Sequence, residues 1–87
     1  MTTEAIQQKV IAIVAKKFSA DPLKISGETR LADDLGVDSF GAVELMFEIE
    51  EAFDLKIVDS EIAHVRTVND IVAYLVSWLE RSGPAST

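Results

Sequence analysis

Apolar residues recur at helical spacing in three separate stretches of this chain, and no stretch alternates as a strand would. In the first, the spacing i, i+4, i+7, i+8, i+12 places a stripe on one helix face: Ile6, Val10, Ile13, Val14 and Phe18. The second runs from about 39 to 53, and its expected buried stripe is Val43, Met46, Phe47, Ile49 and Phe53. The third opens at a capping box, Thr67 to Asp70, and continues as Val68, Ile71, Val72, Leu75 and Leu79. The pattern predicts an all-α fold.

The remaining segments complete the predicted architecture. Residues 19–38 have no sustained period, and we expect their apolar side chains to pin a long loop to the core: Leu23, Ile25, Leu31, Leu35 and Val37. A short helix is predicted over Asp59–His64. The fold class is therefore a small bundle of three long helices plus one short helix, with a long loop between the first and second long helices. An 87-residue chain has room for one domain, predicted over 1–82, with a flexible tail over 83–87 after Gly83-Pro84.

Charge and size exclude several classes of function. Fifteen acidic residues against eight basic ones leave a net charge of −7, the wrong sign for binding nucleic acid or anionic lipid. A basic protein partner suits this surface better.

The small size of the chain also limits its function. A chain of this length has little room for an active-site cleft, so we expect no enzyme, and we expect a monomer. Without a signal-peptide pattern or a long apolar run, we expect a cytoplasmic chain that does not insert into membranes.

One acidic stretch stands apart from the rest. From Leu31 to Leu55 there are eight acidic residues and no Lys or Arg, and the sequence Asp33-Asp34-Leu-Gly-Val-Asp38-Ser39 leads into the second helix. Ser39 is predicted at that helix's first turn, where backbone N–H groups and the helix dipole favour an attached anion. Glu44, Glu48 and Glu51 share one face. Because no base accompanies them, we interpret this face as one for recognising a partner.

These residues resemble the acyl carrier protein family. The likeness rests on Asp34-Leu-Gly-Val-Asp-Ser39, Val43-Glu-Leu, Glu50-Glu-Ala-Phe53 and Ile57-Val-Asp59, and it extends over roughly residues 4 to 80. Several positions depart from the family's common pattern. Phe40 stands where leucine usually follows the serine, Gly41 where an acid often comes next and Val58 where proline is common, and residues 59–66 are less acidic than usual. These departures favour a specialised member over the carrier of housekeeping fatty-acid synthesis.

The resemblance implies a carrier rather than a catalyst. Ser39 matches the serine that receives a 4′-phosphopantetheine arm from coenzyme A through a phosphopantetheinyl transferase, and the arm brings the thiol that this cysteine-free chain lacks. Further partners are an acyl-loading ligase or synthase and acyltransferases with basic patches, recognised by Asp38, Glu44, Glu48 and Glu51. Acyl chains of the family can withdraw between the second helix and the short third segment. The matching lining is Val43, Phe47, Ile49, Ile57, Ile62 and Val65.

Two other functions remain open at this point. The same arm serves aminoacyl and peptidyl carriers, although Asp38 and the glutamates favour acyl cargo. An unmodified acidic helical module that binds basic proteins would need no arm. No metal site is predicted, since Asp33, Asp34 and Asp38 lack the spacing of an EF-hand loop and would bind a divalent cation only weakly.

Overall fold

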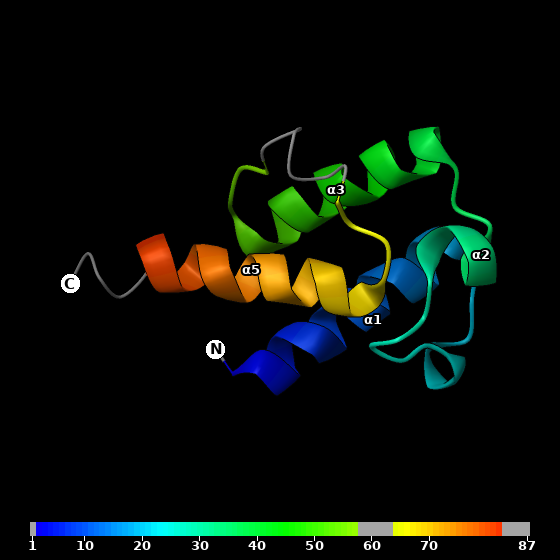
Figure 1. Cartoon of the computed structure of the whole chain (residues 1–87), viewed down its shortest axis with the longest axis horizontal. Coiled ribbons are helices and arrows are strands. Elements are labelled where there is room, and N and C mark those ends of the chain that lie inside the picture. Colours follow the sequence, from blue (N-terminus) through cyan, green and yellow to red (C-terminus); the bar gives the residue numbers. More distant parts are fainter. Residues whose placement is uncertain (1, 58–63, 83–87) are drawn as a thin grey trace.

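Three long helices make up most of the molecule (Figure 1). The structure is a computed structural model, and it describes residues 2–57 and 64–82. The long helices are α1 (Thr3–Phe18), α3 (Ser39–Phe53) and α5 (Val68–Ser82), and the short elements are the 3₁₀ turn η1 (Pro22–Lys24) and the helix α2 (Leu31–Leu35). Within the described residues the only β pairing is an isolated antiparallel bridge between Arg30 and Thr67. The predicted all-α class is confirmed.

The short elements differ from the prediction. The connection between α1 and α3 contains the five-residue helix α2, which is too short to show a period in the sequence. The short helix predicted over Asp59–His64 lies outside the described residues except for His64, and so does the predicted tail over 83–87. No helix in the described part of the chain is long and apolar enough to cross a membrane.

Local side-chain contacts explain where the long helices begin and end. The Thr2 hydroxyl accepts a hydrogen bond from the Ala5 N–H at 3.0 Å at the start of α1. At the start of α5 the predicted capping box is present: the Thr67 N–H donates to Asp70 Oδ2 at 3.1 Å, and the Asp70 N–H donates to Thr67 Oγ1 at 3.2 Å. The Arg66 N–H donates to the same carboxylate, and this bond is the main reason that the pKa of Asp70 lies below its usual value.

The core lies where the three long helices face one another. Each contributes side chains with almost no exposed surface, among them Ile6, Val10 and Val14 of α1, Leu45 and Ile49 of α3, and Val68, Ile71 and Leu75 of α5. Two lysines of α1, one near its middle and one in its last turn, show that α3 runs antiparallel to it. Lys17 lies 3.3 Å from Glu44 and Glu48, whereas Lys9 Nζ donates to the Ala52 carbonyl at 3.0 Å and lies 4.8 Å from the centroid of the Phe53 ring.

Three expected core residues are not buried. Leu23 is 93% exposed, so the prediction that it pins the loop is wrong, although Ile25, Leu31 and Val37 are buried and Leu35 is half-buried as expected. Val43 and Phe47 are 44% and 63% exposed, so their assignment to the buried stripe of α3 is also wrong. The residues that α3 buries are Leu45, Met46 and Ile49, of which Met46 and Ile49 belong to the predicted stripe.

The loop before α3 is tied to the start of α5. The Leu31 N–H donates to the Arg66 carbonyl at 2.9 Å, and the Val68 N–H donates to the Thr29 carbonyl at 3.1 Å. The Asn69 N–H donates to the Gly27 carbonyl at 2.8 Å, and a Cβ on Gly27 would collide with the Asn69 side chain. Residues 27–31 are therefore held against the beginning of the last helix, and this fixes one end of the segment that leads to Ser39.

Candidate functional site

Ser39 is the first residue of α3, and it is exposed. Asp38 caps the helix: its Oδ1 accepts a hydrogen bond from the Gly41 N–H at 2.7 Å, and its backbone carbonyl accepts one from the Ala42 N–H at 2.9 Å. Gly41 suits this turn, since a Cβ there would lie 3.2 Å from Asp38 Oδ1 and 3.4 Å from the Phe18 ring. The hydroxyl of Ser39 thus stands at a helix N-terminus, which favours a negatively charged substituent.

The turn before Asp38 is held by α2. Gly36 ends this helix in the left-handed conformation, with φ of 70°, and its N–H donates to the Ala32 carbonyl at 3.0 Å. The Val37 N–H then donates to the Leu31 carbonyl at 2.9 Å. Because Leu31 is itself bonded to Arg66, the approach to Ser39 is linked through α2 to the start of α5.

Arg30 organises the two acids of α2. Its guanidinium lies 3.3 Å from Asp34 Oδ1 and 3.5 Å from Asp33 Oδ2, and its backbone N–H donates to Asp34 Oδ2 at 2.7 Å. The backbone bond and then the guanidinium hold the pKa of Asp34 below its usual value. Asp33 and Asp34 are thus oriented by Arg30, whereas Asp38 caps α3. The described residues contain no group of three His, Cys, Asp or Glu side chains that could hold a metal ion.

A hollow of about 580 Å³ opens beside Ser39. Its apolar lining comes from α2, the turn after it, α3 and the segment before α5, namely Leu31, Ala32, Val37, Ala42 and Val65. Arg30 and Arg66 also line it, together with Asp33, Asp38 and Thr67. The exposed hydroxyl of Ser39 thus stands beside a hollow that has both apolar walls and charged groups.

The predicted pocket residues are not all brought together. Val65 lines this hollow and is half-buried, whereas Ile49 and Ile57 are buried in the core. Val43 and Phe47 lie on the exposed side of α3 and are not among the residues that line the hollow. Ile62 lies outside the described residues. Sequence reasoning missed Leu31, Val37 and Ala42 at this site, because the hollow forms only when residues 30–31 meet 65–67.

Of the predicted recognition residues, Glu44, Glu48 and Glu51 follow helical spacing on α3 and Asp38 caps it, but the surroundings of the glutamates differ from the expectation. Glu44 and Glu48 share Lys17, whose Nζ is 3.3 Å from an oxygen of each. The expectation that no base compensates these glutamates is therefore wrong, since the cation comes from α1. Glu51 and Asp38 are exposed.

The same helix carries a second exposed feature that sequence reasoning missed. Phe40 is 71% exposed and follows Ser39 directly, and with Val43 and Phe47 it forms a stripe at i, i+3 and i+7. The signal was present in the sequence, because α3 has apolar residues on more of its circumference than one buried stripe needs.

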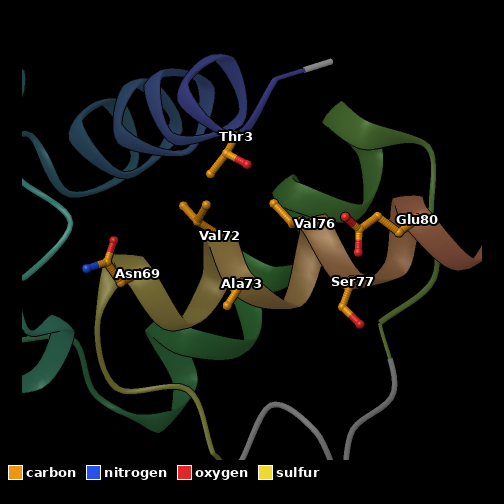
Figure 2. Close-up of a pocket in the computed structure, with 7 residues that line it drawn as sticks. All are labelled: Thr3, Asn69, Val72, Ala73, Val76, Ser77 and Glu80. Carbon is orange, nitrogen blue, oxygen red and sulfur yellow. The ribbon is translucent and has the colours of Figure 1, made fainter.

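A second hollow, of about 490 Å³, lies between the start of α1 and the outer side of α5 (Figure 2). Thr3 faces α5 across it, and the other lining residues come from α5: Asn69, Val72, Ala73, Val76, Ser77 and Glu80. It shares no lining residue with the hollow beside Ser39.

Comparison with known proteins places this geometry in a family. Residues 8–75 match the family described as "Phosphopantetheine attachment site". An acyl carrier protein of Syntrophobacter fumaroxidans is 43% identical over 75 residues, covering 86% of this chain and 93% of the relative. One from Bdellovibrio bacteriovorus is 41% identical over 81 residues, covering 93% of this chain and 99% of the relative. A solved structure from Mycobacterium tuberculosis, assigned as an acyl carrier protein, superposes with a TM-score of 0.78 at 27% identity and covers 84% of this chain and 97% of its own.

Proposed function

The chain belongs to the phosphopantetheine-bearing acyl carrier protein family, and on that premise we propose that it carries acyl groups as thioesters on a 4′-phosphopantetheine arm attached to Ser39. Members of this family are carriers and not catalysts. The proposed pathways are fatty-acid, polyketide or specialised lipid synthesis. Phe40 and Gly41, which depart from the family's common pattern, favour a specialised one.

The observation that carries the proposal is the position of Ser39. Its side chain is exposed at the start of α3, the helix is capped by the preceding Asp38, and a hollow with apolar walls begins at the same residue. The helix N-terminus stabilises the charge of a phosphodiester on Oγ. An enzyme that approaches Ser39 meets no covering element in the described chain, because Asp38, Ser39 and Phe40 are all exposed.

The attachment reaction needs little from this chain beyond the hydroxyl. In the proposed step Ser39 Oγ bonds to the phosphorus next to the pantetheine of coenzyme A, the pyrophosphate linkage breaks, and the adenosine bisphosphate leaves. A phosphopantetheinyl transferase supplies the base that takes the serine proton. The attached arm then supplies the thiol, which this chain without cysteine cannot provide.

We assign the hollow beside Ser39 to the arm and the first carbons of its cargo. Leu31, Val37, Ala42 and Val65 offer apolar contact, worth about 0.8 kcal/mol for each methylene that is buried. Leu45, Ile49 and Leu75 are fully buried, so a longer chain that entered the core would have to displace packed side chains. Short acyl chains therefore gain more protection per carbon than long ones, whose far ends extend beyond the hollow.

The experiment is intact-protein mass spectrometry after incubation with coenzyme A and a phosphopantetheinyl transferase. The expected result is a gain of one phosphopantetheine per chain, followed by acylation when a fatty acid and an acyl–carrier ligase are added. No gain of mass would contradict the proposal and favour an unmodified helical module. A gain of the arm followed by loading only with aminoacyl groups would instead identify an aminoacyl or peptidyl carrier.

A further inference from the structure

Lys17 joins two of the three exposed glutamates of α3 from a different helix. It lies in the last turn of α1, and its Nζ is 3.3 Å from Glu44 Oε1 and 3.3 Å from Glu48 Oε2. The Lys17 side chain is only 24% exposed, whereas those of the glutamates are 42% and 46% exposed. The carboxylates thus face solvent while the lysine lies beneath them, against the body of the molecule.

The two ion pairs favour the charged form of Lys17. The hydrogen bond to Glu48, opposed by partial burial and helped by the hydrogen bond to Glu44, raises the pKa of Lys17 above its ordinary value. Lysine is charged at neutral pH in any case, and the ion pairs favour that form further. An ammonium group has three donors, so it can bind both carboxylates at once. Because Lys17 is held on α1, the fold keeps its ammonium at a high effective concentration near these oxygens, unlike a cation that must arrive from solution.

We propose that Lys17 competes with the basic residues of partner enzymes for Glu44 and Glu48, and so weakens recognition at the middle of α3. The inference rests on the proposed function. A partner that presents a Lys or Arg to these positions must displace an internal cation, whereas one that presents it to Glu51 or Asp38 need not, since the described part of the chain gives neither an ion pair. Lys17 therefore acts as a specificity-determining residue that favours partners directed to the two ends of α3.

The test compares Lys17→Gln with Lys16→Gln in the apo chain. Lys16 is also in the last turn of α1 and is exposed, so its substitution removes the same net charge at the same end of the same helix.

The readout is kcat/KM for loading by a phosphopantetheinyl transferase that has a basic docking face, with coenzyme A as donor, at low and at moderate salt. We expect Lys17→Gln to raise kcat/KM over Lys16→Gln by about two- to fivefold at low salt, the factor that an exposed ion pair supplies. The gain should shrink as salt screens the pair.

A double-mutant cycle separates competition from a purely structural effect. In the Glu44→Gln/Glu48→Gln background, Lys17→Gln should give the same rate as Lys16→Gln, while Lys17→Arg in the native background should keep the wild-type rate. Urea unfolding of each variant reports any loss of the α1–α3 contact separately from the rate.

Equal rates for Lys17→Gln and Lys16→Gln in a native chain that is loaded normally would overturn this inference alone, and so would a slower Lys17→Gln. Failure of the native chain to be loaded at all would overturn the proposed function, and this inference with it.

Discussion

Two adjacent residues at the start of α3 have separable roles. The Asp38 carboxylate accepts a hydrogen bond from the Gly41 N–H at 2.7 Å, and so it satisfies one of the first-turn N–H groups that have no partner within the helix. The neighbouring Ser39 side chain is instead exposed beside the hollow. The place of Ser39 at the helix start was predicted from the local sequence, whereas Asp38 was assigned only to partner recognition and its role as the cap was missed. The cap uses the carboxylate as a hydrogen-bond acceptor, and this use does not require its charge.

Substitutions at Asp38 test that distinction. Asp38→Ala should lower the free energy of unfolding by about 0.5–2 kcal/mol, since the cap is lost, whereas Asp38→Asn should stay close to wild type because asparagine caps as well as aspartate. Urea unfolding followed by circular dichroism measures both. If the two variants lost equal stability, the charge of Asp38 and not its hydrogen bond would be stabilising α3.

At the scale of elements, periodicity predicted the long helices but not which face of α3 is buried. The bounds 39–53 agree with the structure, because the motif that ends at Ser39 and the helical spacing that ends at Phe53 are local features of the sequence. The choice between the two apolar stripes depended on where α1 lies, and no local pattern contains that information. Neither α2 nor the hollow beside Ser39 could be predicted, since α2 has only five residues and the hollow joins residues more than 30 positions apart.

The two stripes of α3 should respond differently to truncation. Ile49→Ala removes a fully buried side chain and should cost about 2–5 kcal/mol of unfolding free energy. Phe47→Ala removes a larger side chain that is 63% exposed, so it should stay within about 1 kcal/mol of wild type. Chemical denaturation of both variants under one set of conditions makes the comparison. A Phe47→Ala cost as large as that of Ile49→Ala would mean that Phe47 is buried in solution.

The whole molecule carries a net charge of −7, and its ion pairs relieve only part of the repulsion. Lys17 and Arg30 each hold two carboxylates, so both clusters keep a negative balance. The charge total could be read from the composition, but the placement of Lys17 against α3 could not, since the lysine and its partners are more than 25 residues apart in the chain.

Screening should therefore stabilise the apo chain. Added salt weakens the attractive pairs and the repulsion together, but the repulsion involves more charges. We expect the melting temperature to rise between low and moderate salt, by roughly 4–8 °C for each 1 kcal/mol that screening returns. Differential scanning calorimetry over a salt series measures this, with an uncharged osmolyte as control. A melting temperature that is flat or falls with salt would show that the ion pairs, and not the repulsion, dominate.

The central claim is that Ser39 alone carries the arm, and site-resolved mass spectrometry tests it most directly. After loading from coenzyme A, fragmentation of the peptides should place one phosphopantetheine on Ser39, and Ser39→Ala should abolish the gain of mass. Ser26→Ala is the matched control, since Ser26 is another exposed serine of the described chain, and it should load as the native protein does. A group found on any other residue, or a Ser39→Ala variant that still gains the full mass, would contradict the account.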